Sequence, residues 1–383
     1  MGYFRTNPKN GTLLGALACA AFLTWVRVCS FRVFLVGAVL PCLLYGFFGS
    51  RTFALGTFKH KVVLVTGASS GLGRALAIEA AARGASMVVL VARSEDGLRE
   101  TAKMIRSLKG PGAQTVVEVI PLDATSPAEV RALPPKVEAL GLGPVAVLVN
   151  CAGSGDWKRV VDTECEEAAA HMSCPYQAAY NVTSVLLPSM LRYARSKRTA
   201  AAGHNSRKVA NPDLPGVHVL NVTSAAAFTA WRGSASYGAA RWAMRGFNDF
   251  LRAEVKADKV GVTLLNPGQI RGTRYLASNH VDLAHLPFFF GLGLDNPRAY
   301  DCGMVATRAL QGVEDGECEV HVPGPVVHSL VSLAALAPSL VWWLVDLAPP
   351  PLLQRIFLRS KEAKNGAADA AGADAGGPAK KED

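Results

Sequence analysis

A serine, a tyrosine and an arginine stand at spacings that suit the reduction of a carbonyl group. Ser224 follows an apolar run from Val217 to Val222, and Tyr237 opens a helical run that continues to Glu254. Tyrosine is a weak acid with a pKa of about 10, so it protonates an alkoxide at neutral pH only beside a cation. Arg241 lies one helical turn further on, on the same face. We predict Tyr237 as general acid and base, Ser224 as the group that polarises the carbonyl, and Arg241 as the cation.

A nucleotide-binding turn lies upstream, in the stretch VVLVTGASSGLGRALA from Val62 to Ala77. Its four leading apolar residues predict a buried strand, and a helical run opens at Arg74, so the glycines fall in a strand-to-helix turn. Glycine permits positive φ and lets the backbone approach a pyrophosphate, whose charge the helix dipole favours. The residues predicted to bind a dinucleotide here are Thr66, Gly67, Ser69, Gly71, Leu72 and Gly73.

The end of the next predicted strand, Ser86 to Val91, bears on which dinucleotide is bound. A fold that prefers NAD carries an acidic residue there, on the ribose hydroxyls. In this chain Ala92 and Arg93 take that position, so no carboxylate repels a 2′-phosphate and a guanidinium can bind one. The sequence favours NADP(H), with Arg93 as phosphate ligand and Arg74 as a helper. A solvated arginine at a strand end is the alternative.

Three further segments complete the cofactor side of the predicted site. Asp123 ends a predicted strand that begins at Val116, where its carboxylate can bond an adenine amine or cap a turn. NCAG follows the predicted strand 145–149, and a Pro-Gly pair ends the predicted strand 264–268. The residues assigned to the cofactor from these segments are Asp123, Asn150, Ala152, Gly153, Pro267, Gly268 and Ile270, together with Tyr237 and Arg241.

These motifs together resemble the short-chain dehydrogenase/reductase family, over about Lys61 to Val322. The TGxxxGxG spacing, the serine and tyrosine, and NCAG in place of the family's NNAG carry the resemblance. It implies a Rossmann-type α/β fold, with a doubly wound parallel sheet in a single catalytic domain. It also implies hydride transfer between NADP(H) and an alcohol or ketone. With the apolar stretches 12–26 and 33–48 before this region and Pro338 and Trp342-Trp343 after it, the chain also resembles the membrane-anchored branch of 11β-hydroxysteroid dehydrogenase-like proteins and 3-ketosphinganine reductases. This resemblance implies a lipophilic substrate, whether lipid, sphingoid or steroid-like.

Two positions depart from the family pattern. The family's lysine is here Arg241, which keeps the charge but cannot release a proton. The family's relay asparagine is here Pro175, which has no side-chain amide but kinks a helix. We therefore expect a bend that exposes a carbonyl without an amide relay, and Asn181 faces another way. A second hypothesis follows: a catalytically impaired NADP(H)-binding membrane protein with a binding or regulatory role.

The elements that must position these residues alternate between strand and helix, which is typical of a parallel sheet covered on both faces. A long helix is predicted from Glu166 to Tyr193, and the stretch 192–215 reads as a basic surface insertion, either solvated or in contact with anionic lipid. A helix over 296–310 and a last strand over 319–322 follow. Residues 274–300 fall at the family's substrate lid, where three consecutive phenylalanines line a pocket, pack on the core or enter a bilayer.

Both ends of the chain are apolar. Residues 12–26 and 33–48 predict a membrane anchor, either one span with one interfacial segment or a hairpin, and the stretch is too long for a cleaved signal peptide. Residues 326–345 contain paired tryptophans and predict an interfacial or re-entrant segment, or else a subunit-packing helix. The predicted organisation is an anchor and linker over 1–60, the Rossmann domain over 61–325, a membrane-associated segment over 326–358 and a disordered tail over 359–383.

The amino-acid composition limits the classes of binding partner to expect. The chain is 50% hydrophobic, only 18% charged, and carries a net charge of +10, without a basic stripe interleaved with aromatics. This pattern favours a membrane surface or an anionic cofactor over nucleic acid. The eight cysteines are scattered without metal-ligand spacing, so we expect neither a metal site nor a disulfide framework. The expected partners are a lipophilic small molecule and membrane lipid, with a homodimer as a further candidate, and the expected location is the endoplasmic reticulum membrane.

Overall fold

The computed structural model of the chain describes residues 51–322, except 142, 157, 203–215, 229–232, 269 and 271–299, and the side chains of 197–202. The predicted anchor stretches 12–26 and 33–48, the substrate lid except Tyr300, the C-terminal apolar segment and the tail lie outside the described residues. Within the described part, no helix combines the length and the apolar character that a membrane crossing requires.

Seven parallel strands form a single sheet in the order β3-β2-β1-β4-β5-β6-β7. The strand order reverses between β1 and β4, which is the point where doubly wound sheets bind ligands at their carboxyl edge. This topology confirms the predicted fold class. The strands are β1 (Val62–Thr66), β2 (Met87–Ala92), β3 (Val116–Pro121), β4 (Val147–Asn150), β5 (His218–Val222), β6 (Gly261–Pro267) and β7 (Glu319–Val322).

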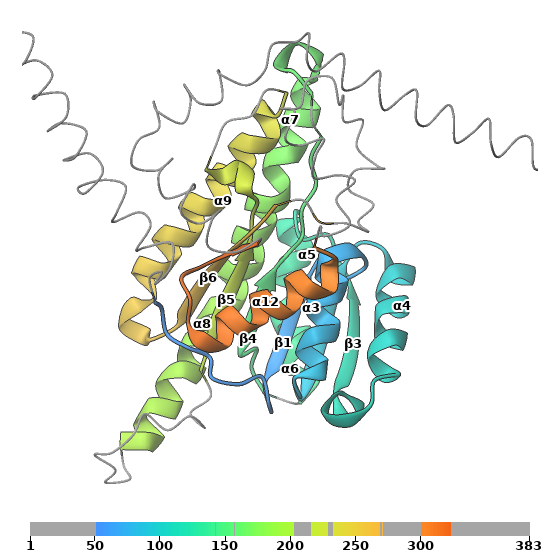
Figure 1. Cartoon of the computed structure of the whole chain (residues 1–383). Coiled ribbons are helices and arrows are strands. Elements are labelled where there is room, and N and C mark those ends of the chain that lie inside the picture. Colours follow the sequence, from blue (N-terminus) through green and yellow to red (C-terminus); the bar gives the residue numbers. More distant parts are fainter. Residues whose placement is uncertain are drawn as a thin grey trace, which may run out of the picture.

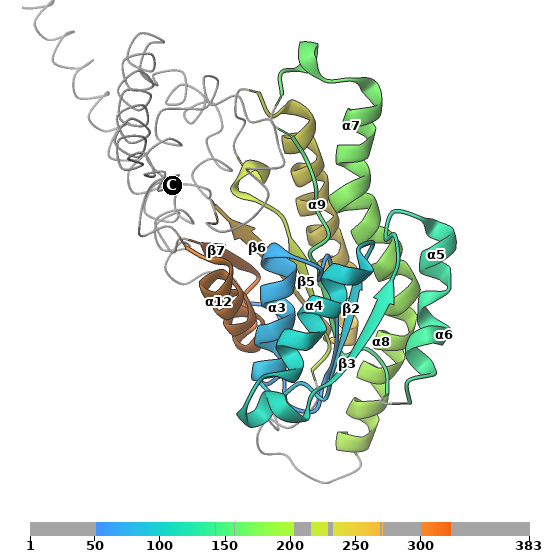
Figure 2. The ribbon, with the colours of Figure 1, turned by 90° about the vertical axis from the view of Figure 1, so that its right-hand side faces the viewer.

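Helices cover both faces of this sheet (Figures 1 and 2). One face carries α3 (Gly71–Ala82), α4 (Glu95–Arg106) and α12 (Cys302–Asp315). The other face carries α8 (Ala178–Ala202) and α9 (Ala235–Glu254), with the short helices α5 (Pro127–Arg131) and α6 (Leu133–Glu138). Since the central strands are buried on both sides, they consist of unbroken apolar runs such as VVLVT and MVVLVA.

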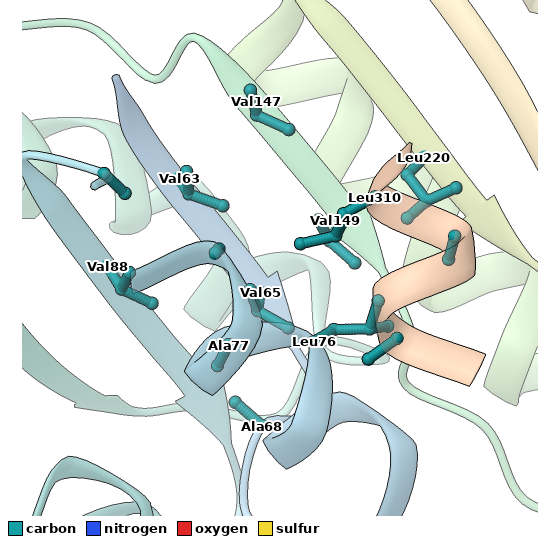
Figure 3. Close-up of a cluster of buried hydrophobic side chains, with 14 of the residues drawn as sticks. Val63, Val65, Ala68, Leu76, Ala77, Val88, Val147, Val149, Leu220 and Leu310 are labelled. Atoms are coloured by element: carbon teal, nitrogen blue, oxygen red, sulfur yellow. The ribbon is translucent and has the colours of Figure 1, made fainter. Parts of the chain in front are cut away.

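The core on the first face explains how the nucleotide-binding turn is held. Leu76 of α3 and Leu310 of α12 are fully buried and pack toward β1 and β4, where Val65 and Val149 meet them (Figure 3). The small residues of α3, such as Ala77, let this helix lie close to the strand that precedes it. The position of the α3 amino terminus therefore follows from packing along its whole length.

Two helices, α8 and α12, end later than the sequence predicts. Helix α8 continues to Ala202 instead of ending at Tyr193, so the expected surface insertion begins later than predicted. Its last turns hold arginine, lysine and alanine, which are good helix formers, and the first glycine or proline after Pro188 is Gly203. Helix α12 ends at Asp315 instead of residue 310, before Gly316 with a φ of 69°.

Residues 51–58, which the sequence analysis assigned to the anchor and linker, pack along the amino-terminal edge of the sheet. The Thr52 N–H donates to the Gly316 carbonyl at 2.7 Å, and the Leu55 N–H donates to the Val313 carbonyl at 3.0 Å. The side chains of Leu55 and Phe58 are buried. The chain therefore enters the domain at the edge opposite the carboxyl ends of the strands.

Candidate active site

The predicted site residues gather at the carboxyl edge of the sheet. Thr66 ends β1, Asn150 ends β4 and Pro267 ends β6, while Arg93 directly follows β2 and Ser224 closely follows β5. Parallel strands bring these ends to one side, so residues far apart in the sequence share one edge. The site is thus assembled from at least five strand ends and the two helices α3 and α9.

The nucleotide-binding turn has the geometry that its glycines predict. Gly67 has a φ of 70°, and a Cβ on it would lie 2.9 Å from the Ala152 backbone. A Cβ on Gly73 would lie 2.2 Å from the Gly67 carbonyl oxygen, so only glycine lets the helix begin here. Helix α3 starts at Gly71, three residues before the predicted start, and Ser70 does not cap it with its side chain. With no acidic residue in the first turn, its N–H groups suit a phosphate.

Two residues predicted to bind the cofactor, Thr66 and Asn150, make hydrogen bonds within the protein. The Thr66 hydroxyl accepts hydrogen bonds from the backbone N–H groups of Cys151 and Ala152, at 3.0 and 3.1 Å. The buried Asn150 amide donates to Thr183 and Asn221 at 3.0 and 2.9 Å. Thr66 therefore positions the turn after β4, and Asn150 is held by its amide nitrogen while its Oδ1 has no hydrogen-bond partner among the described residues.

Three charged residues near the predicted adenosine end of the site, Asp123, Arg74 and Arg93, differ in their contacts within the protein. One Asp123 carboxylate oxygen accepts hydrogen bonds from the Thr125 N–H and hydroxyl at 2.9 and 2.8 Å, which is the turn-capping alternative considered from the sequence. Arg74 donates to the Ser69 carbonyl at 2.6 Å and to Glu100 at 2.7 Å, so it braces the glycine turn. Arg93 is exposed.

Tyr237 and Arg241 lie together near the start of α9, and both are buried, at 6% exposure each. The guanidinium carbon lies 4.8 Å from the centre of the tyrosine ring. Arg241 Nη2 donates to the Ser154 carbonyl at 3.4 Å, while its buried Nε has no hydrogen-bond partner among the described residues. No described carboxylate forms an ion pair with this guanidinium. A buried cation in this state has donor capacity left for a cofactor ribose or phosphate.

The loop from Gly153 to Asp156, called here the 153–156 loop, lines this pair. A Cβ on Gly153 would lie 3.1 Å from Arg241 Nη2. Gly155 has a φ of 145°, and a Cβ there would lie 2.5 Å from Tyr237 Cδ2. The sequence analysis named Gly153 and missed Gly155, although the Gly-Ser-Gly spacing after NCA is the signal that marks it.

The long helix is bent where Pro175 predicted it. A π-helical turn, η4 (Ser173–Gln177), separates α7 (Cys165–Met172) from α8, and Cys174 has φ −133° and ψ 99°. A residue before proline avoids the α region, which explains the break. The Cys174 carbonyl accepts hydrogen bonds from the Ser154 N–H and hydroxyl, both at 3.3 Å. The freed carbonyl is therefore turned to the 153–156 loop.

Ser224 is half-buried and caps a short 3-10 helix, η5 (Ala225–Ala227), with its hydroxyl accepting from the Ala226 N–H at 3.3 Å. The preceding Thr223 hydroxyl donates to the Arg241 carbonyl at 3.0 Å, which joins the end of β5 to α9. On the far side of the site, the Gly268 N–H donates to the Val322 carbonyl at 2.8 Å.

Cys151 stands where the family pattern has its second asparagine. Burial raises the pKa of its thiol to about 12, against the opposing charge of Arg241. A thiol that stays protonated at neutral pH neither attacks a carbonyl nor binds a metal readily.

The chain matches the short chain dehydrogenase family over residues 61–201 and 207–282. It belongs to this family. Among its curated relatives, bovine dehydrogenase/reductase SDR family member 7B is 29% identical over 290 residues, which cover 75% of this chain and 81% of the relative. The ketoacyl reductase HetN of a Nostoc species is 25% identical over 278 residues, which cover 72% of this chain and 84% of that protein. This short-chain dehydrogenase is accordingly an oxidoreductase.

Solved structures share the fold of this short-chain dehydrogenase. One from Sphingobium yanoikuyae, in complex with NADPH, superposes with a TM-score of 0.56 at 22% identity, over 75% of this chain and 96% of that one. One from Burkholderia phymatum, in complex with NAD, gives a TM-score of 0.56 at 22% identity, over 74% of this chain and 95% of that one. These two structures thus hold different dinucleotides.

Proposed function

We propose that this short-chain dehydrogenase transfers hydride between NADP(H) and a lipophilic ketone or alcohol, with Tyr237 as general acid and base. The observation that carries the proposal is the buried Arg241 guanidinium. It lies 4.8 Å from the Tyr237 ring centre, at the carboxyl edge of the sheet, without a carboxylate partner among the described residues.

The residues at this edge divide the work of the reaction. A bound nicotinamide supplies the hydride chemistry. Tyr237 gives its phenolic proton to the carbonyl oxygen during reduction and takes it back during oxidation. Arg241 stabilises the resulting phenolate and binds the ribose, while the Ser224 hydroxyl polarises and orients the carbonyl. The glycine turn and the start of α3 hold the pyrophosphate.

Two observations support NADP(H) as the cofactor. The end of β2 lacks a carboxylate, and Arg93 is exposed there. An exposed guanidinium at this position suits a 2′-phosphate. The solved structure from Sphingobium yanoikuyae, which contains NADPH, is consistent with this choice.

A membrane location and a lipid-like substrate are supported by the apolar stretches 12–26, 33–48 and 326–345, which flank the catalytic domain in the sequence. We propose the endoplasmic reticulum membrane as its location. A homodimer is supported by large aromatic side chains exposed on α8 and α9: Tyr180 is 47%, Trp242 49% and Phe250 75% exposed.

A second function is favoured by two features of the residues that would resupply the proton to Tyr237. Arg241 cannot release a proton, and the Cys174 carbonyl at the helix bend already accepts two hydrogen bonds from Ser154. These features suit a protein that binds NADP(H) with little turnover and serves a binding or regulatory role.

Thermal unfolding of the purified full chain with NADPH or NADH tests the cofactor, because a ligand bound only by the native state raises the melting temperature. We expect a larger rise with NADPH. NADPH oxidation with a panel of long-chain and steroid-like ketones then tests turnover. An equal rise with both dinucleotides contradicts the cofactor assignment, and binding without turnover on any ketone favours the second function.

A further inference from the structure

A buried histidine outside the predicted site connects two parts of it. His171 lies near the end of α7 and is 7% exposed. Its Nδ1 is 2.8 Å from the Ser236 hydroxyl oxygen on α9, and its Nε2 is 3.1 Å from the backbone nitrogen of Asp156. Helix α7 projects beyond the sheet beside the start of α9 (Figures 1 and 2).

The two contacts fix the form of the imidazole. A backbone N–H can only donate, so His171 Nε2 accepts from Asp156 and carries no proton. The ring proton is therefore on Nδ1, from which it donates to the Ser236 hydroxyl. One neutral ring thus holds a backbone group of the loop and a side chain of the helix at once.

The two partners of His171 adjoin the catalytic pair. Ser236 directly precedes Tyr237 at the start of α9. Asp156 is the last residue of the 153–156 loop. Gly155, just before it, lies against the Tyr237 ring with no space for a Cβ. The same loop bonds Arg241 through the Ser154 carbonyl. His171 therefore sets the separation between the loop and the helix that together enclose the phenol.

The other end of the 153–156 loop is held separately. The Ser154 N–H and hydroxyl donate to the Cys174 carbonyl at the helix bend. The loop is thus fixed at one end by η4 and at the other by α7, both parts of the bent helix. Losing the His171 bond would release only the end that lies on the tyrosine ring.

We propose that His171 is a positioning residue for Tyr237: through Asp156 and Ser236 it clasps the 153–156 loop to the start of α9 and so fixes the direction of the phenol. The inference rests on the proposed role of Tyr237 as the proton donor. His171 itself touches neither substrate nor cofactor in this assignment, and its effect passes through its two hydrogen bonds.

The test compares His171→Phe, which removes both hydrogen bonds, with His171→Gln, whose amide offers one donor and one acceptor. In the full-length protein we expect His171→Phe to lower kcat roughly 10- to 100-fold, because small errors in the position of a reacting group have effects of that size. The Kd for NADPH is expected to stay within about twofold, because the phosphate-binding turn is not touched. His171→Gln is expected to recover most of the lost kcat.

Hydrogen exchange gives a readout that does not depend on turnover. Peptides covering the 153–156 loop and the start of α9 are expected to exchange faster in His171→Phe than in wild type, and at nearly the wild-type rate in His171→Gln. Faster exchange throughout the domain in both variants, with a matching fall in melting temperature, indicates only a structural role and overturns the proposal. An unchanged kcat in a folded His171→Phe protein overturns it as well.

The same variants show whether the proposed role of Tyr237 or only the proposed role of His171 is wrong. If wild type shows no turnover, or if Tyr237→Phe turns over at the wild-type rate, the assignment of Tyr237 fails and the positioning role fails with it. If wild type turns over and Tyr237→Phe does not, while His171→Phe leaves local exchange and kcat unchanged, only the role of His171 is refuted.

Discussion

The guanidinium carbon of Arg241 lies 4.8 Å from the centre of the Tyr237 ring, one turn further along α9, and both side chains are buried. Arginine keeps its charge at every physiological pH, so this pair places a permanent cation beside the phenol. The backbone of the 153–156 loop lies against both side chains.

Replacing Arg241 by alanine is expected to lower kcat roughly 100-fold, since a preorganised charge at the reacting centre contributes an effect of that size. Arg241→Lys keeps the charge and adds a proton that can be released, so we expect it to match or exceed the wild-type kcat. Steady-state NADPH oxidation measures both. No turnover in wild type or in Arg241→Lys supports the second, non-catalytic function.

Gly155→Ala tests the packing of the loop on Tyr237. A Cβ at this position would lie 2.5 Å from Cδ2, so the ring or the loop must move. We expect kcat to fall roughly 10- to 100-fold. Gly110→Ala is the control, because Gly110 also has a positive φ, of 68°, but has no atom within 4 Å of an added Cβ. If both variants keep the wild-type kcat, the loop does not determine the position of the phenol.

Arg93→Ala is expected to weaken NADPH binding roughly 10- to 100-fold and leave NADH binding unchanged, because only NADPH carries the 2′-phosphate that a guanidinium would bind. The matched control is Arg99→Ala: Arg99 is exposed on α4 and pairs with Glu95 at 2.5 Å. Fluorescence titration with each dinucleotide gives the two Kd values. Equal weakening of both dinucleotides by Arg93→Ala would contradict the assignment of this residue.

The buried His218 predicts a loss of stability in acid. Burial lowers its pKa from 6.5 to about 3, so in the folded protein it stays neutral where the unfolded chain binds a proton. Its contribution is therefore complete above about pH 6.5 and declines as the pH falls toward 3, at up to about 1.4 kcal/mol per pH unit. Denaturant unfolding at pH 7 and pH 5 measures this slope.

The same measurement on variants assigns the slope to one histidine. His218→Gln retains an amide that can reach Thr263, the partner of His218 Nε2 at 2.8 Å, and is expected to flatten the pH dependence. His60 is exposed with a φ of 61°, so His60→Asn serves as a control that tolerates this backbone conformation. An unchanged slope in His218→Gln would refute the assignment.

The fold was predictable because its signals are local. Apolar runs marked the central strands such as β1 and β2, and glycines at fixed spacing marked the turn after β1. The bend at Pro175 also followed from one residue type, since proline restricts the residue before it. The end of α8 was predicted wrongly because its basic residues suggested a loop, although arginine, lysine and alanine favour helix.

The contacts within the site were not predictable, because they join residues that only the fold brings together. Nothing near His171 in the sequence indicates that its ring bridges Asp156 and Ser236. The sequence likewise shows no sign that the Asn150 amide donates to Thr183 and Asn221 in a buried network. Residue type and spacing identified the strand ends but not the direction of each side chain.

The most direct test is Tyr237→Phe, which removes the phenolic oxygen and retains the ring that packs on Gly155. We expect kcat for ketone reduction by NADPH to fall roughly 100- to 10,000-fold, because the general acid is lost, with the melting temperature and the Kd for NADPH close to wild type. A Tyr237→Phe protein that reduces the same ketone at the wild-type rate would contradict the central claim that this phenol supplies the proton.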